Sequence, residues 1–232
     1  MDKLIASAFL AVRSLFTYGM MKIFIKSIIV TLIALVCFIF FSSLFFTWLA
    51  HLLQGHLIAH FLPWLGSLGA TFIAWILFPG IMPLIINFFD ETIAAIIEER
   101  NYPESMKGIE QAFWPKFWHD LRFSLTAIGL NILVLPLYLV PGINLLLFYS
   151  LNGYLLGREF FCMVARRHIS LPETDDLYRR HSALIITAGI ILSIMATIPI
   201  ANLFAPFWGI ATMVHLYHRL VPKLRIEFIE NQ

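Results

Sequence analysis

The chain has 232 residues, of which 60% are hydrophobic and 13% are charged, and its formal net charge is +2. A soluble domain carries roughly 25% charged residues, so this composition excludes an ordinary soluble globular protein and indicates an integral membrane protein. Because no linker or low-complexity segment divides the sequence, we predict a single membrane domain over residues 1–232.

The 16 basic and 14 acidic residues are confined to four blocks, which leave three stretches without charge. A charged side chain at mid-bilayer costs about 2.5–3.5 kcal/mol, so the charge-free stretches 27–89, 123–157 and 181–218 are expected to lie in lipid. All Lys and Arg residues lie in the four charged blocks, which precede, separate and follow these stretches. By the positive-inside rule, the blocks and both chain termini are therefore predicted to be cytoplasmic.

Residues 1–18 are predicted to form an amphipathic helix that lies on the membrane surface, because apolar side chains recur along one helical face. Gly19 interrupts this pattern. Lys22 and Lys26 then mark the cytoplasmic entrance to the first deep segment. Since the first long apolar run follows 26 residues that carry four basic side chains, we do not expect a removable signal peptide.

The stretch 27–89 is long enough for two crossings of about 20 residues each. Pro79, Gly80 and Pro83 predict a break near residues 78–83 of the second crossing. Residues 104–120 mix aromatic with charged side chains and are predicted to be an interfacial segment. The outer loop carries three histidines, but no Cys, Asp or Glu completes a ligand set there, so no metal site is expected. These histidines are His51, His56 and His60.

The stretches 123–157 and 181–218 must each leave and return to the cytoplasm within 35 and 38 residues, whereas two ordinary spans with a turn need about 44. We therefore predict two helical hairpins that penetrate the bilayer only partly. A Pro-x-x-Asn sequence lies at each tip, ending in Asn144 and Asn202. Either these residues stop one helix and cap the next, or the two helix amino termini line an anion route.

No catalytic motif is present: Gly-x-Ser-x-Gly, His-Glu-x-x-His, phosphate-loop and dinucleotide patterns are all missing, so we expect neither an enzyme nor a cofactor. Arg158 and Glu159, at the end of the first hairpin, are interpreted as an ion pair that either gates a route or caps a helical arm. His215 and His218 share a helix face and are interpreted as markers of the membrane boundary.

The run from Asn152 to Phe161, which continues to the basic residues Arg166 and Arg167, resembles a Gly-x-Glu-Phe-type run of the CysZ-type sulfate permeases and the related etoposide-induced-protein-like membrane family. The resemblance covers nearly the whole chain, including the acidic exit at residues 98–103. It implies a multi-pass bacterial inner-membrane protein that forms homo-oligomers and admits sulfate for cysteine biosynthesis. We expect no nucleic-acid partner.

In this family a Gly-Leu-Arg-Arg-like sequence between the first two helices binds sulfate. The residues that match it here are Gly19, Met20, Met21 and Lys22. One cation is retained, but the paired arginines are absent, so bidentate contacts to an oxyanion are lost. Two alternatives stay open: these basic residues only anchor the membrane segment, or the whole chain is a non-transporting membrane scaffold.

Overall fold

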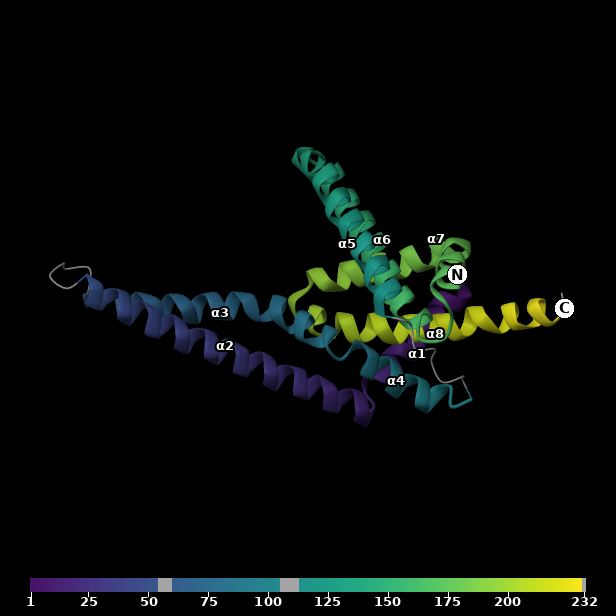
Figure 1. Cartoon of the computed structure of the whole chain (residues 1–232), viewed down its shortest axis with the longest axis horizontal. Helices are drawn as coiled ribbons and strands as arrows, with labels where there is room; N and C mark the ends of the chain where they lie inside the picture. Colours follow the sequence, from purple (N-terminus) through teal and green to yellow (C-terminus); the bar gives the residue numbers. More distant parts are fainter. Residues whose placement is uncertain (54–59, 105–112, 231–232) are drawn as a thin grey trace. The chain divides into compact units, whose positions relative to one another are not determined.

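The computed structural model describes residues 1–53, 60–104 and 113–230, and these residues form helices with no strand among them (Figure 1). Four helical stretches in this part of the chain are long and apolar enough to cross a membrane, which confirms an all-α membrane fold. The elements are α1 (Asp2–Leu15), α2 (Tyr18–Leu52), α3 (Leu62–Asn87), α4 (Asp90–Asn101), α5 (Phe113–Val134), η2 (Leu135–Leu139), α6 (Ile143–Ala165), α7 (Leu171–Thr197) and α8 (Pro199–Glu230).

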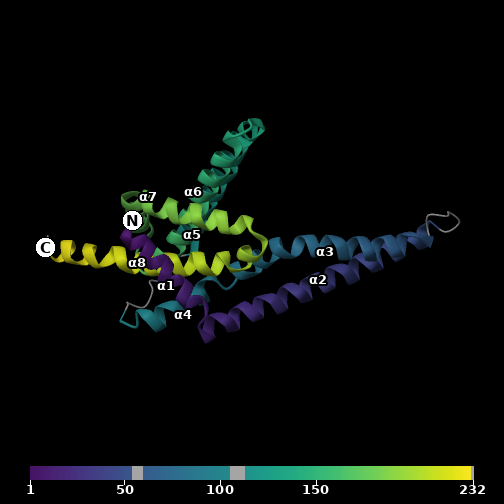
Figure 2. The same ribbon diagram turned by 180° about the vertical axis from the view of Figure 1, so that it is seen from behind.

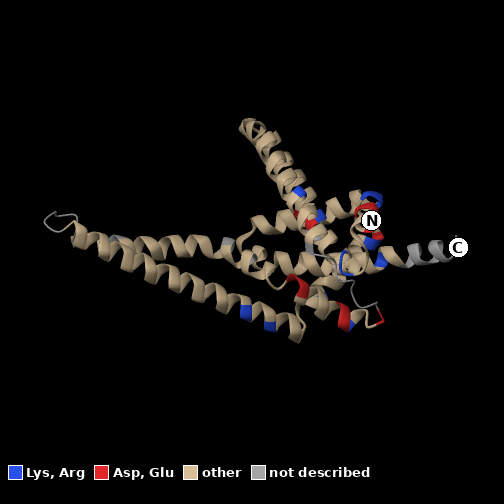
Figure 3. Cartoon of the chain, in the orientation of Figure 1, with Lys and Arg blue, Asp and Glu red and all other residues tan. Residues whose placement is uncertain are grey.

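The chain divides into two compact units: residues Met21–Phe89 form one, and Met1–Met20 with Asp90–Gln232 form the other. The first consists of α2 and α3, whose exposed faces carry large apolar side chains such as Phe41, Trp48 and Trp75. Such faces are suited to lipid rather than water. Figure 3 shows the Lys residues of this unit near the start of α2 and no charged residue along α3.

Buried residues recur every four positions along much of α3, at Leu62, Gly66, Ala70 and Ala74. A Cβ atom on Gly66 would lie 2.5 Å from the Phe46 side chain of α2, so the small residue permits the close approach of the two helices. The expected break at residues 78–83 is wrong, because α3 continues to Asn87. In lipid a broken helix would leave further backbone groups unpaired, at several kcal/mol each, which favours the continuous helix.

The second unit is built around α8, which is buried on all sides from Ala205 to Tyr217. Helices α1, α4, α6 and α7 pack against it (Figure 2). Ser7 and Ser14 lie on the buried face of α1, and each hydroxyl donates to the carbonyl four residues earlier. The large apolar side chains of Ile5 and Phe9 on α1 remain exposed, which fits a helix that lies on a membrane surface.

Helices α6 and α7 contact each other through glycine. A Cβ atom on Gly189 would lie 2.0 Å from the carbonyl oxygen of Gly153 and 2.7 Å from the amide nitrogen of Gly157. No side chain larger than hydrogen fits there without separating the two backbones. The sequence therefore uses glycine at positions 153, 157 and 189 to bring the first hairpin against the second.

The two shorter charge-free stretches, 123–157 and 181–218, form helical hairpins, as predicted. The α5–η2–α6 hairpin turns at Gly142, whose φ of 88° is a conformation that favours glycine. The α7–α8 hairpin turns at Ile198, which is extended before Pro199. Their arms extend beyond the charge-free stretches: α7 begins at Leu171, before the stretch 181–218, and its 27 residues rise about 40 Å. That the hairpins penetrate only partly stays a prediction.

The predicted interfacial segment 104–120 falls partly on residues 105–112, which lie outside the described residues. From Phe113 onward the chain already belongs to α5, which continues without interruption into the hairpin. Pro115 interrupts nothing because it lies in the first turn, where the missing amide has no partner inside the helix.

Candidate functional site

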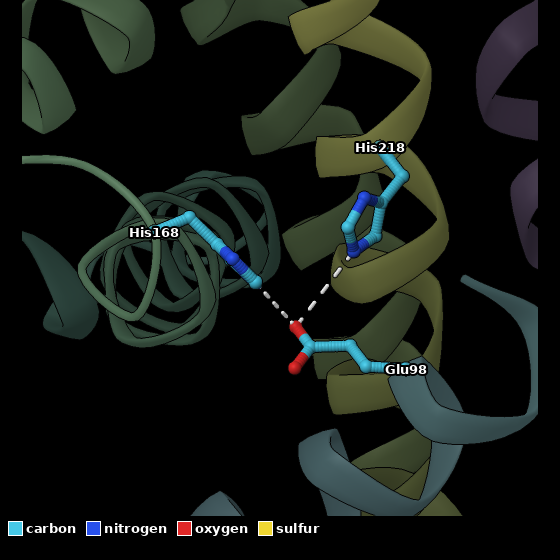
Figure 4. Close-up of side chains that lie close together, drawn as sticks. All are labelled: Glu98, His168 and His218. Carbon is cyan, nitrogen blue, oxygen red and sulfur yellow. Dashed lines mark hydrogen bonds and ion pairs between the residues drawn. The ribbon is translucent and has the colours of Figure 1, made fainter. Parts of the chain in front are cut away.

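Four polar side chains converge inside the second unit, and we call Glu98, Arg167, His168 and His218 the Glu98 cluster. Figure 4 shows Glu98 with the two histidines. Oε1 of Glu98 lies 2.7 Å from Nε2 of His168 and 3.8 Å from Nε2 of His218. The guanidinium of Arg167 donates to Oε2 of Glu98 through two nitrogens, at 3.1 and 3.3 Å. One carboxylate thus meets three groups that are cationic or can become so.

Three separate elements supply these side chains. Glu98 lies on the buried face of α4, beside Ile97 and Ala94. Arg167 and His168 belong to the short connection between α6 and α7, and His218 lies on α8. The connection is held by a capping box at the start of α7, in which the backbone amide and hydroxyl of Ser170 donate to Oε2 of Glu173.

Aromatic and polar contacts extend the cluster towards α1. The ring of Tyr102 stacks on His218 with a centroid separation of 4.0 Å, and its hydroxyl is 2.8 Å from Nδ1 of His215. Nε2 of His215 is in turn 3.1 Å from the hydroxyl of Ser14. The ring of His168 stacks on Tyr217 at 5.0 Å. These contacts fix the ring planes of both cluster histidines.

Burial alone would raise the pKa of Glu98, but the hydrogen bond with His168, the proximity of His218 and the charge of Arg167 together lower it to about 2. The carboxylate is therefore ionised throughout the physiological pH range. Nε2 of His218 is buried and has no hydrogen-bond partner within the described structure. It faces the Glu98 carboxylate at a distance longer than a hydrogen bond.

The sequence interpretation placed His215 and His218 at the membrane boundary, whereas in the structure both take part in this polar network. His215 is 1% exposed and is bonded through both ring nitrogens. Their spacing of three residues on α8 was the available signal. The sequence offered no means to pair them with Glu98, because that contact crosses more than one hundred residues of chain.

A second charged group lies where α5, α6 and α7 meet. Arg158 donates to Asp175 at 3.4 Å, and Asp175 also contacts His119 at 3.2 Å. The Arg158 guanidinium lies over the ring of Phe123, 4.7 Å from its centroid. The predicted ion pair of Arg158 with Glu159 is replaced by this pair with Asp175, because adjacent residues on a helix point in different directions. Glu159 itself is exposed.

The other predicted pathway residues lie at the hairpin tips. Asn144 is in the first turn of α6, where its side-chain oxygen accepts from the amide of Leu145 at 2.8 Å. Asn202 is in the first turn of α8. Fourteen residues of helix separate Asn144 from Arg158, about 21 Å along the axis, so the structure does not gather these residues into one site.

The four predicted anion-binding residues lie at the start of α2, which begins at Tyr18. The break between α1 and α2 falls at Phe16 and Thr17, so Gly19 is already helical. A Cβ atom on Gly19 would lie 3.0 Å from the Ile96 side chain of α4. Met20 is 1% exposed, and Lys22 is exposed. Gly19 therefore serves close packing rather than the helix break.

Comparison with known proteins gives one family. The family model described as Sulfate transporter CysZ/Etoposide-induced protein 2.4 matches residues 7–206. No curated protein and no solved structure matches the chain. The matched residues include the start of α2, the first hairpin, α7 with the first residues of α8, and three of the four residues of the Glu98 cluster. The chain therefore belongs to the Sulfate transporter CysZ/Etoposide-induced protein 2.4 family.

Proposed function

We propose that the protein is a permease for sulfate or a related oxyanion in the bacterial inner membrane, and that it supplies sulfate for cysteine biosynthesis. Family membership and the four helical stretches of membrane length support this proposal. The observation that carries it to particular residues is the start of α2, where an exposed lysine follows a helix amino terminus.

The first four backbone amides of a helix have no partner inside it, and the helix dipole adds partial positive charge at the same end. In α2, which begins at Tyr18, these amides include those of Tyr18, Gly19 and Met20. Gly19 has no side chain to cover them, and Lys22 adds a full positive charge one turn into the helix. An oxyanion is the ligand suited to such a combination. We propose that Gly19, Met20, Met21 and Lys22 form the anion-binding entrance.

The hairpins would shape the route beyond the entrance. Asn144 and Asn202 each lie in the first turn of a helix at a hairpin tip, where backbone amides carry partial positive charge. Arg158 is engaged by Asp175, so it suits a gate better than a primary anion ligand. Glu159, exposed beside it on α6, would keep anions from settling there.

The route is proposed to be passive. No Asp or Glu occurs in the three charge-free stretches, so no carboxylate is positioned to carry protons across the bilayer. A homo-oligomer with both termini in the cytoplasm completes the proposal, and its copies would enclose the route between them. A bacterial inner membrane is the site where such a permease meets periplasmic sulfate.

Uptake of radiolabelled sulfate into proteoliposomes tests the proposal. We expect flux above that of empty liposomes, a strong reduction in Lys22→Ala and a smaller change in Lys26→Ala. Lys26 is the matched control because it removes the same charge one turn further along α2, where the ammonium lies over the ring of Phe89. Flux equal to that of empty liposomes, together with no anion binding, would remove the permease hypothesis.

The non-transporting scaffold is the alternative that this result would favour. A deletion strain separates the two, provided that no second importer operates. Slow growth on limiting sulfate supports the permease, whereas normal growth with altered envelope morphology supports the scaffold.

A further inference from the structure

The Glu98 cluster has a second property that is independent of anion transport. Glu98, His168 and His218 each offer one donor atom, and these three atoms all lie within 4.8 Å of one another. Two imidazole nitrogens and one carboxylate oxygen form a donor set that zinc accepts in proteins. We propose that Glu98, His168 and His218 bind a divalent transition-metal ion of the zinc type.

The spacing of the donor atoms suits such an ion. With ligand bonds of about 2.0–2.2 Å, neighbouring donors in a tetrahedral zinc site are about 3.4 Å apart. The two separations from Glu98 are 2.7 and 3.8 Å, one shorter and one longer than this value. Small rotations of the side chains would bring the two distances closer to this value.

The protonation chemistry of the cluster also suits a metal. Nε2 of His168 lies 2.7 Å from Oε1 of Glu98, so the two atoms share one proton in a hydrogen bond. A divalent ion would replace that proton, as metal binding to histidine requires. Nε2 of His218 is buried without a hydrogen-bond partner in the described structure, so a metal would satisfy an atom that is otherwise left unpaired.

The surrounding contacts hold the three ligands in place. Arg167 occupies Oε2 of Glu98 and leaves Oε1 directed at the two histidines. Tyr217 stacks on His168, and Tyr102 stacks on His218. Ligands with such outer contacts keep their orientation before the metal arrives, and removal of one outer contact commonly costs 10- to 100-fold in affinity. The three ligands supply three bonds and leave a fourth position for water.

A metal at this point would connect α4, the α6–α7 connection and α8. These elements already meet through the Glu98 carboxylate, so the ion would strengthen an existing junction. All three ligands lie in one compact unit, and the site does not depend on the anion entrance proposed at the start of α2.

Titration of the chelator-treated full-length protein in detergent with Co²⁺ or Zn²⁺ alone tests the proposal. We expect one ion per chain, with the visible absorption of tetrahedral Co²⁺, and displacement of cobalt by zinc. His218→Ala should weaken binding by at least about ten-fold. His119→Ala is the matched control, because this half-buried histidine pairs with Asp175 outside the cluster, and it should bind as the wild type does.

A second variant keeps the test decisive if His218→Ala is poorly folded. His218→Cys retains a metal ligand and should add a thiolate-to-cobalt charge-transfer band in the near ultraviolet. The His119→Ala control keeps both native cysteines but no thiol in the cluster, so it should lack this band. Absence of Co²⁺ absorption in the folded wild type would overturn the proposal. Binding that is unchanged in both His218 variants would assign the ion to surface histidines and would also overturn it.

Discussion

Nε2 of His168 lies 2.7 Å from Oε1 of Glu98, although the two residues are seventy positions apart in the sequence. This contact joins α4 to the connection between the two hairpins, and both side chains are largely buried. Hydrogen bonds that involve an ionised group are about twice as strong as neutral ones, and more so where water is excluded. The pair therefore ties α4 to the α6–α7 connection beside α8.

Replacing Glu98 by Gln should destabilise this unit strongly. The amide has nearly the same shape, but it leaves the Arg167 guanidinium without a counter-charge, and breaking a buried pair costs roughly 3–5 kcal/mol. Thermal unfolding in detergent should show a lower Tm for Glu98→Gln. Glu99→Gln is the matched control, because Glu99 follows Glu98 on α4 but is exposed. Equal Tm values for the two variants would contradict the importance given to the cluster.

Gly189→Ala should separate α6 from α7. The added Cβ would lie 2.0 Å from the Gly153 carbonyl oxygen, which is so close that the two backbones must move apart. Gly129→Ala makes the same change on α5, where nothing lies within 4 Å, and there alanine should stabilise the helix by about 0.5–1 kcal/mol. Gly189→Ala should therefore lower the Tm and alter the elution profile in size-exclusion chromatography. Gly129→Ala should raise the Tm and leave the elution profile unchanged. A Gly189→Ala protein that elutes and melts as the wild type does would show that the helices are not held by this contact.

Much of the fold could be predicted from the distribution of charge. The charge-free stretches gave two long helices and two hairpins, and the structure shows both sets. The continuity of α3 through Pro79 and Pro83 could not be predicted from local sequence, because it depends on the cost of unpaired backbone groups in lipid. The buried role of α8 was also missed, since an apolar helix has the same composition whether it faces lipid or protein.

The candidate sites divide in the same way. The start of α2 could be found from sequence because Gly19 and Lys22 are three residues apart in one short run. The Glu98 cluster could not be found in this way, because its members come from three elements and carry no spacing that a sequence pattern records. The partner of Arg158 was likewise missed: its neighbour Glu159 is close in sequence, but Asp175 is close in space.

The stability of the protein should fall as pH rises from about 4 to 7, through Asp90. Burial, with smaller contributions from the charges of Glu159 and Glu91, raises the pKa of Asp90 from 3.8 to about 7. Oδ1 of Asp90 is buried and has no hydrogen-bond partner in the described structure. In this pH window the folded state binds more protons than the unfolded state, so increasing pH removes stability. Above pH 7 the loss from this group is complete.

Asp90→Asn should abolish that dependence. We expect the free energy of unfolding of the variant, relative to that of the wild type, to be about 2 kcal/mol higher at pH 8 than at pH 5. The comparison is made by Tm at the two pH values. Asp176→Asn serves as the control, because Asp176 is exposed and pairs with the exposed Arg180 one turn away, so its effect should be small at both values. A constant difference between Asp90→Asn and the wild type across this range would show that Asp90 is already ionised at pH 5.

Restoring two arginines at the start of α2 should strengthen anion binding. The family resemblance implies an arginine pair at the positions of Met21 and Lys22, and Lys22 offers a single ammonium in place of a planar guanidinium. Each added charge-assisted hydrogen bond contributes about 1.5–3 kcal/mol, so the double variant Met21→Arg/Lys22→Arg should bind sulfate at least about ten-fold more tightly. Equilibrium binding of radiolabelled sulfate measures the change. Ile25→Arg adds the same charge to an exposed position one turn further along α2 and should raise the affinity much less. If Ile25→Arg binds sulfate as tightly as the double variant does, the gain comes from net charge and not from a site at Gly19–Lys22.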